Sequence, residues 1–397
     1  MSTYSMLRNV VWVVGVVLFG TAADAGARLR PLDGAMAKVM DRGWPGVSVL
    51  VEYADGRVET ATSGLANIET NAPMTADTGF HLCSVNKALT AVALLRLVDQ
   101  GKVSLDQKVT DILEQPVVKR IPHINNVTVR MLLDHSSGIY PTNNDPDYIR
   151  TLIGEEAFSG RVWTPEEMVE LATRPQNKPE GKPGEGHHYS DTNYVLAGMI
   201  VARVAGEPYK THIARTIFRP LGMERTYFYS DVLAGNQAAS ATVANGYLKL
   251  SKALTDAVVF NRGFKSPREG WLNSSSAAER IDAAGGTVTT LPDLRKFAHA
   301  LFRGQLMSAR SQAFMTAVAG EVANAEIGKH KTRALQGAIT TFGLVIYKEG
   351  DGPGGFNTLM AVHPKSGTVF LGFTNQFGDF DEVDAMMTDI MGAVTPR

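Results

Sequence analysis

The stretch HLCSVNKALT, residues 81–90, places a serine three residues ahead of a lysine where a helix is expected to begin. The run that follows repeats apolar residues at helical spacing as far as Gly101, namely Leu89, Val92, Leu95 and Val98. Residues three apart lie on the same face of a helix, so Ser84 and Lys87 would be neighbours. The stretch therefore predicts a helix whose first turn carries a hydroxyl beside an amine.

Ser84 and Lys87 have the chemistry of a nucleophile and its base. An acyl-transfer nucleophile needs a group that takes the hydroxyl proton and N–H donors that stabilise an oxyanion. Lys87 can take the proton, and the first turn of a helix has free backbone N–H groups. The alternative is that Ser84 caps the helix and Lys87 is solvated. Because S-x-x-K is frequent by chance, the pair alone does not decide between the two interpretations.

A second candidate is HHYSDTNYVLAGMIVARVAG, residues 187–206, where a polar loop leads into an apolar helical pattern. Tyr189 and Asp191 are two apart, so an extended segment would place both on one side. A tyrosine can serve as a base if a neighbouring cation lowers its pKa. The alternative is that Asp191 caps the helix and Tyr189 is a packed aromatic residue.

Composition sets broad limits on function. The chain has 397 residues, 44% of them hydrophobic and 20% charged, with a formal net charge of −1. These values favour a globular protein with a sizeable core and two lobes, and give no reason to expect nucleic acid as a partner. The single cysteine, Cys83, excludes an internal disulfide framework. No H-E-x-x-H metal motif, P-loop or dinucleotide fingerprint occurs, so no cofactor is predicted. No G-x-S-x-G elbow occurs, which counts against an α/β-hydrolase.

The N-terminus has the pattern of a secretory signal peptide over residues 1–25. Arg8 precedes an apolar run over residues 10–19, and Ala23-Asp24-Ala25 follows as an A-x-A cleavage site. The alternative is a retained anchor, but the run is shorter than the ~20 residues that a membrane span needs. We therefore expect an exported protein, periplasmic or secreted, with no stable membrane span after cleavage.

Strand patterns occur near both ends of the chain. GVSVLVEYADGRVETATSGLAN, residues 46–67, contains an Asp55-Gly56 turn typical of a β-hairpin. TFGLVIYKEG, NTLMAVHP and TVFLGFTNQ are the later strands, and the tail DEVDAMMTDIMGAV predicts a closing helix. Between them lie helical patterns joined by PTNNDPD and RPQNKPEGKPGEGHH, which are expected to be exposed connections. The predicted class is α+β, an antiparallel sheet flanked by helices plus a mainly helical lobe.

Four ordered stretches make the chain resemble the serine β-lactamase and D-alanyl-D-alanine carboxypeptidase superfamily, in its soluble carboxypeptidase and esterase branch. They are CSVNKALTAVALLRLVDQGKVSLDQKV, VTVRMLLDHSSGIY, YSDTNYVLAGMIVARVAGEPY and RPLGMERTYF. The resemblance implies the β-lactamase/transpeptidase-like fold over residues 26–397. It implies an α/β lobe at about 26–110 and 265–397 and a helical lobe at about 111–264. Ser84 corresponds to the acylated nucleophile, Lys87 to its proton acceptor and Tyr189 to the proton-passing tyrosine. His135 lies in a family stretch near the site.

The resemblance also marks two departures. Asp191 stands where the family usually has asparagine. The third family motif is a Lys or His, a small residue and a Gly, and we place it in GDGPGGF, residues 350–356, where no basic residue occurs. Asp351 is the preferred match to the basic position, and Gly352-Pro353-Gly354 is the alternative triplet. Gly354 or Gly355 would then supply the second oxyanion N–H. Read without the resemblance, GDGPGGF is a flexible hairpin loop.

These departures bear on the substrate. An ionised Asp191 cannot donate a hydrogen bond, and it would favour the charged form of Lys87. A missing cation and an acidic Asp351 would disfavour substrates with a carboxylate, such as β-lactams and peptides ending in D-alanine. The prediction is an exported serine hydrolase that acts through a Ser84 acyl-enzyme on an amide or ester of a small molecule or peptide. It would be D-alanyl-D-alanine carboxypeptidase-like or esterase-like. The alternative is a non-catalytic member that uses the cleft for binding.

Overall fold

The computed structural model describes residues 31–40, 43–153, 161–235, 242–249, 270–278, 281–317, 330–332, 334–340, 343–377 and 388–394. The predicted signal peptide lies outside these residues. Within them, no helix combines the length and apolar character that crossing a membrane requires.

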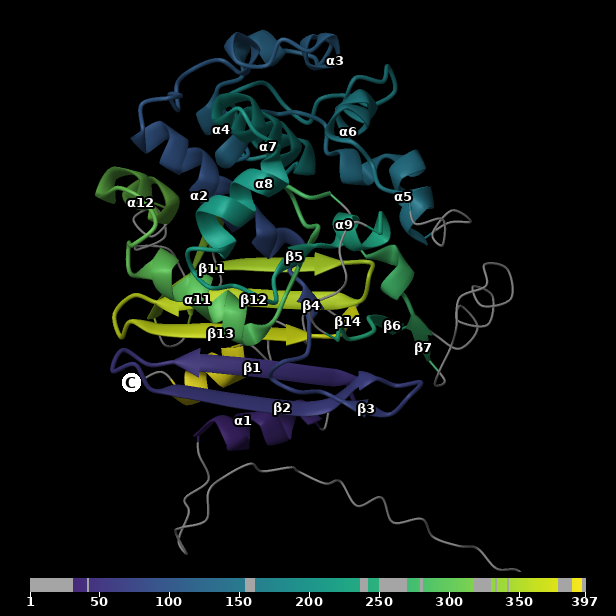
Figure 1. The fold of residues 1–397 in the computed structure, drawn as a ribbon, viewed down its shortest axis with the longest axis vertical. Coiled ribbons are helices and arrows are strands. Elements are labelled where there is room, and N and C mark those ends of the chain that lie inside the picture. The colour runs from purple at the N-terminus through teal and green to yellow at the C-terminus, as the bar shows by residue number, and fades with distance from the viewer. Residues whose placement is uncertain are drawn as a thin grey trace, which may run out of the picture.

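An eight-stranded antiparallel sheet forms the centre of the fold (Figure 1). Its order is β3-β2-β1-β13-β12-β11-β10-β9, so the strands from the two ends of the chain meet where β1 pairs with β13. The strands are β1 Gly46–Glu52, β2 Val58–Asn67, β3 Ala72–Pro73, β9 His330–Thr332, β10 Gln336–Thr340, β11 Gly343–Gly352, β12 Phe356–His363 and β13 Thr368–Thr374. Two three-stranded sheets join β4 Phe80–His81, β8 Thr287–Thr289 and β5 Tyr227–Phe228, and β14 Gln376–Phe377, β6 Tyr247–Lys249 and β7 Trp271–Asn273.

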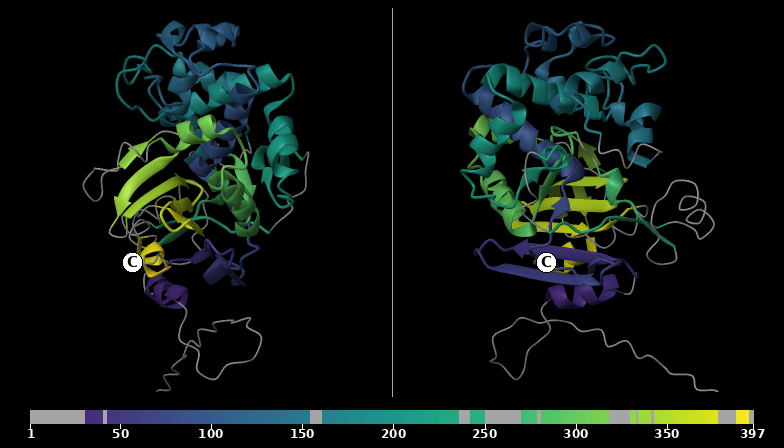
Figure 2. Two further views of the ribbon diagram at one scale, coloured as in Figure 1. Left: turned by 90° about the vertical axis from the view of Figure 1, so that its left-hand side faces the viewer. Right: turned by 45° about the vertical axis from the view of Figure 1, so that its right-hand side comes forward.

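Helices cover both faces of the main sheet. Figures 1 and 2 place α1 at the end of the molecule opposite α3, with the sheet between them. The helices are α1 Pro31–Met40, α2 Asn86–Asp99, α3 Pro116–Lys119, α4 Val129–Leu133, α5 Pro146–Ile153, α6 Pro165–Ala172, α7 Asp191–Ala205, α8 Tyr209–Ile213, α9 Tyr229–Leu233, α11 Leu291–Phe302 and α12 Ala309–Thr316. Short 3-10 turns include η1 Cys83–Val85 and η4 Thr142–Asn144.

The sheet separates two hydrophobic cores. On β1, Leu50 belongs to the larger core with α2, α7 and α11, whereas Val49 and Val51 belong to a smaller core with α1. Successive side chains on a strand point to opposite faces, so a strand buried on both sides reads as a continuous apolar run. Residues 388–394, the described part of the predicted closing helix, are helical and place Ile390 in the smaller core.

The fold class is confirmed, as are the antiparallel sheet and the first hairpin, which closes through a hydrogen bond from Tyr53 N to Arg57 O. One connection was predicted wrongly. PTNNDPD is not an exposed loop, because Thr142 and Asp145 are fully buried where it forms η4 and begins α5. The lobe boundary at 110–111 stays a prediction, and the one at 264–265 falls outside the described residues.

A buried carboxylate joins the sheet to α11. Glu52 on β1 is 1% exposed, accepts a hydrogen bond from Arg295 at 2.6 Å, and contacts the ring of His299. Burial raises the pKa of Glu52, but the bonds from His299 and Arg295 outweigh that effect, so the pKa lies below its ordinary value. The ionised carboxylate therefore stabilises the fold above the unfolded pKa, and this contribution is lost as pH falls through the folded pKa.

Glu52→Gln is expected to lower the free energy of unfolding by about 2 kcal/mol at pH 7, because it removes two charge-assisted hydrogen bonds. The difference from wild type should shrink as the pH of a urea titration is lowered toward 4. Glu224→Gln, at an exposed glutamate, is the control. Equal stability of Glu52→Gln and wild type at pH 7 would contradict the role of this carboxylate.

Candidate active site

Ser84 lies in η1, the tight turn that leads from β4 into α2. The backbone at this turn is held from two sides: Leu82 N donates to Thr287 O at 2.9 Å, and Thr358 Oγ1 donates to His81 O at 3.0 Å. Cys83 takes the left-handed conformation with φ of 48°, which turns the chain sharply just before Ser84. The nucleophile candidate is thus fixed by neighbours on β8 and β12.

Two side chains meet on the hydroxyl of Ser84. Lys87 Nζ lies 2.9 Å from Ser84 Oγ, and the Tyr189 hydroxyl lies 2.7 Å from the same oxygen. The N-cap of α2 is Val85, so Ser84 does not cap this helix. Lys87 is 0% exposed and is therefore not a solvated surface lysine. The geometry excludes the alternative interpretation of this pair and places an amine and a phenol within proton-transfer reach of one hydroxyl.

Asp191 provides the counter-ion of Lys87. The two side chains form an ion pair, and Lys87 also donates to Ala284 O at 3.1 Å. Asp191 is the first residue of α7, after Ser190 in extended conformation, and its carboxylate contacts lysine instead of capping the helix. A buried ammonium needs such a partner, so the ion pair favours the charged form of Lys87.

His135 supports the tyrosine. Its fully buried ring stacks on the Tyr189 ring at a centroid distance of 4.3 Å, and its Nδ1 accepts a hydrogen bond from Ser190 N at 3.2 Å. Burial, aided by the charges of Lys348 and Lys87, lowers the pKa of His135 well below its ordinary value, so the ring is neutral. Sequence reasoning placed His135 near the site without giving it a contact.

Tyr189 is a hydrogen-bond donor at neutral pH. Burial raises the pKa of its phenol to about 12, although the charge of Lys87 acts in the opposite direction. The charge of Lys87 lowers this pKa, as expected of a neighbouring cation, but burial has the larger effect. The phenol holds its proton and donates it toward Ser84.

The strand β11 forms the third side of the site. Its contacts place the third family motif earlier in the chain than GDGPGGF. A Cβ at Gly350 would lie 2.6 Å from the amide nitrogen of Ser84, so only glycine lets this strand approach the nucleophile. Two residues earlier stands Lys348, which is 1% exposed, with Nζ 5.4 Å from the centroid of the Tyr189 ring. Lys348-Glu349-Gly350 thus provides a basic residue and a glycine at the spacing sought in GDGPGGF. GDGPGGF contains no basic residue, as the sequence analysis says, but a lysine two residues before Gly350 lines the same pocket.

The residues first assigned to this motif lie further along. Asp351 lines the pocket beside Gly350, but a Cβ at Gly354 would strike Ala278, and one at Gly355 would strike the amide of Tyr247. Gly355, with φ of 85°, belongs to the turn into β12. Neither glycine has the contact with the Ser84 amide that Gly350 has. The K-x-G spacing was a signal in the sequence, but it was missed because a small middle residue was expected.

These residues share a pocket of 540 Å³. Ser84, Tyr189, Asp191 and Lys348 line it together with Glu349, Asp351, Gln336, His187, Asn143 and an apolar group that includes Tyr148, Ile149, Leu152, Pro353 and Phe377. His187 is exposed at the wall of this pocket, and its ring meets that of His135 edge-on at 5.6 Å. The pocket thus combines a hydroxyl in contact with an amine and a phenol, charged groups and an apolar wall, as substrate sites do.

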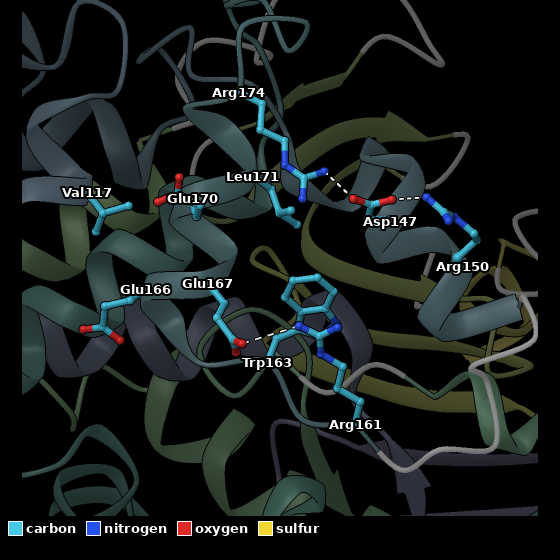
Figure 3. Close-up of a pocket in the computed structure, with 10 residues that line it drawn as sticks. All are labelled: Val117, Asp147, Arg150, Arg161, Trp163, Glu166, Glu167, Glu170, Leu171 and Arg174. Carbon is cyan, nitrogen blue, oxygen red and sulfur yellow. Dashed lines mark hydrogen bonds and ion pairs between the residues drawn. The ribbon is translucent and has the colours of Figure 1, made fainter.

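A second cavity, of 600 Å³, offers no comparable chemistry (Figure 3). Its three arginines each contact a carboxylate: Arg174 and Arg150 contact Asp147, and Arg161 lies 3.4 Å from Glu167. Among the described residues that line it there is no serine, cysteine, lysine or tyrosine. The chemically equipped site is the pocket at Ser84.

Comparison with known proteins agrees with the fold. The Beta-lactamase family model matches residues 32–390. A putative D-alanyl-D-alanine carboxypeptidase of Escherichia coli K12 is 30% identical over 233 residues, which cover 55% of this chain and 51% of that protein. The chain spans about half the length of the curated relatives it matches.

Two solved structures are similar over most of their length. D-amino acid amidase from Ochrobactrum anthropi SV3 has a TM-score of 0.74 at 25% identity and covers 92% of this chain and 97% of its own. A D-stereospecific amidohydrolase from Streptomyces sp. has a TM-score of 0.70 at 25% identity, with coverage of 90% and 97%. The chain belongs to the β-lactamase family, whose members are serine hydrolases.

Lys348 is expected to destabilise the fold. Burial, with the charge of Lys87, lowers its pKa to about 7, well below the unfolded value of 10.5. Between these values the unfolded chain binds a proton that the folded protein does not, so stability rises with pH over this interval. Lys348→Met should raise the free energy of unfolding by on the order of 2 kcal/mol at pH 7, and by progressively less as pH approaches 10.5.

Urea unfolding at pH 7 and pH 10 measures this effect, with Lys365→Met at an exposed lysine as the control. A Lys348→Met protein less stable than wild type at pH 7 would show that the lysine is compensated in the fold.

Asp191→Asn is expected to move the acid limb of the kcat/KM–pH profile to lower pH. The carboxylate favours the charged form of Lys87, whereas the neutral amine is the form that accepts the proton. Without the carboxylate, the amine of Lys87 becomes neutral at a lower pH. Steady-state rates from pH 4 to pH 9 with an activated ester measure the limb, and Asp106→Asn at an exposed aspartate is the control. An acid limb that stays in place would exclude this role of Asp191.

Proposed function

We propose that this protein is an exported serine hydrolase that cleaves an amide or ester carbonyl through an acyl-enzyme on Ser84. The observation that carries the proposal is the meeting of Lys87 Nζ and the Tyr189 hydroxyl on Ser84 Oγ, at 2.9 and 2.7 Å, in a pocket of 540 Å³. The proposal that the protein is exported rests on the signal-peptide pattern of residues 1–25.

The proton transfers follow from these contacts. Neutral Lys87 accepts the proton of Ser84 as Oγ attacks the carbonyl carbon. The amide of Ser84 stabilises the oxyanion, and a backbone N–H of β11 beside Gly350, where the strand packs against that amide, would be the second donor. Tyr189 donates its proton to the leaving group and regains one from the Lys87 ammonium. Water then hydrolyses the acyl-enzyme by the reverse transfers.

The substrate class that the site supports is small amides and esters. The presence of Lys348 removes one reason to exclude substrates with a carboxylate, because a cation lies in the pocket wall. D-alanyl-D-alanine carboxypeptidase-like activity is therefore a second candidate, also supported by the relative in Escherichia coli. The amidase structures from Ochrobactrum and Streptomyces support cleavage of amides without that carboxylate. No residue of the proposed cycle calls for a cofactor.

The alternative to catalysis is a binding role, which the departures in the second and third family motifs suggest. Lys348 restores one of them, and the contacts of Ser84 provide what acyl transfer requires. A purely binding function would have no need of an amine and a phenol placed on one hydroxyl, so catalysis is the better-supported proposal.

Wild-type protein is expected to gain one fluorophosphonate adduct by intact mass and to hydrolyse p-nitrophenyl acetate and butyrate. Ser84→Ala should gain no adduct, and its kcat should fall by about 10⁴-fold or more, as for loss of a catalytic serine. Ser276→Ala, at a serine that does not line the pocket, is the control. Turnover that does not depend on Ser84 would favour the binding role.

A further inference from the structure

The segment just before β8, residues 282–284, contacts α2 with three successive backbone carbonyl groups. In chain order, the three carbonyl oxygens accept hydrogen bonds from the side chains of Asn86 at 2.8 Å, Thr90 at 2.7 Å and Lys87 at 3.1 Å. All three donors are fully buried. We call residues 282–284 the carbonyl segment. Because its last carbonyl binds Lys87, the segment helps to set the position of the proposed base.

The carbonyl segment is held in place by packing from several elements. Its chain turns tightly, so that the backbone N–H groups of residues 284–286 all point to Ile281 O at 2.9–3.0 Å. A Cβ at Gly198 on α7 would lie 2.6 Å from the side chain of Ala283, so α7 approaches the segment closely. Beyond the turn, Tyr229 N donates to Gly286 O at 2.8 Å. The position of the carbonyls therefore depends on contacts with α2, α7 and α9.

Asp282 carries the one charged side chain of this segment, and it binds two further helices. Its Oδ1 accepts a hydrogen bond from Ser230 Oγ on α9 at 2.6 Å, and its Oδ2 lies 3.7 Å from Lys210 Nζ on α8. Lys210 also forms an ion pair with Asp231 on α9 and donates to Ser230 Oγ at 3.2 Å. The carboxylate of Asp282 thus ties the carbonyl segment to α8 and α9.

This cluster of Lys210, Ser230, Asp231 and Asp282 lies outside the pocket of Ser84. None of its four members is among the described residues that line the pocket. Burial raises the pKa of the Asp282 carboxyl, the charge of Asp231 acts in the same direction, and the Ser230 hydrogen bond and the charge of Lys210 oppose them. An acidic group kept there at this cost does not meet substrate. Its link to the chemistry runs through the backbone of its own segment.

We propose that Asp282 is a positioning residue for the base of the reaction. By binding α8 and α9 it fixes the carbonyl segment, and Ala284 O in turn keeps the Lys87 amine in reach of Ser84 Oγ. The inference rests on the proposed function and adds to it a residue that does not touch substrate. Groups that contact substrate act efficiently only when their supporting contacts hold them within a fraction of an ångström.

The test compares Asp282→Ala with Asp282→Asn, using kcat/KM for p-nitrophenyl acetate from pH 4 to pH 9. Asp282→Ala releases the segment and should lower the plateau of kcat/KM at least about 10-fold, because the base is displaced. Its acid limb should move to lower pH, because a carbonyl that favours the ammonium form of Lys87 is lost. Rates are expressed per site titrated with a fluorophosphonate, so that unfolded protein does not count.

Asp282→Asn is the conservative variant that separates position from charge. Asparagine keeps the shape and can accept the Ser230 hydrogen bond, so this variant should retain kcat/KM within about 3-fold and keep the acid limb of wild type. Asp106→Ala, at an aspartate whose side chain is 74% exposed, is the control and should behave as wild type. The variants leave unchanged the other titratable groups that face Lys87, which are His135, Tyr189, Asp191, Tyr194, Lys348 and Asp351.

A wild-type rate and acid limb in Asp282→Ala would overturn the inference. An equal loss, or an equal shift of the limb, in both Asp282 variants would also overturn it, because the charge would then act directly. If Asp282→Ala does not fold, Ser230→Ala replaces it and should lower kcat/KM at least about 3-fold with a shift in the same direction; no change would overturn the inference. Ser84-dependent turnover by wild type leaves the proposed function standing in each case, and its absence would refute both.

Discussion

The structure of the site depends on the burial of one ammonium group. Lys87 is 0% exposed, and such a charge is tolerated only because Asp191, Ala284 O and Ser84 Oγ surround it. These partners come from α7, from the segment before β8 and from the turn before α2. The requirement to satisfy one lysine thus holds together elements that are more than 190 residues apart in sequence. Tyr189 reaches Ser84 because it lies just before the N-terminus of α7, which begins with Asp191.

Local pattern was enough to predict the residues that act within one turn or one loop. Ser84 and Lys87 share a helix face, and Tyr189 and Asp191 share an extended segment, so spacing alone paired each set. The antiparallel sheet also followed from the sequence, because β1 and β2 flank an Asp-Gly turn and the later strands are bounded by Gly and Pro. Contacts between distant segments had no such signal. The stacking of His135 on Tyr189 and the joining of Glu52 to α11 depend on tertiary packing alone.

Lys348 shows how a residue of the site can be overlooked in a strand. Its neighbours in TFGLVIYKEG have the pattern of an ordinary half-buried strand, and the third family motif was expected in the glycine-rich turn beyond it. The decisive feature is the contact between Gly350 and the Ser84 amide, where a side chain would not fit. Such a contact depends on the approach of two segments more than 260 residues apart, and this cannot be predicted from residue spacing. The same packing buries Lys348 and lowers its pKa to about 7, a cost that is typical of functional sites.

A crystal structure of the protein after reaction with a fluorophosphonate would test the central claim most directly. The account predicts a phosphorus–oxygen bond to Ser84, with one phosphonyl oxygen between the amide of Ser84 and the backbone of Gly350–Asp351, and with Lys87 and Tyr189 still in contact with Oγ. An adduct on another residue, or a phosphonyl oxygen that points away from β11, would contradict it.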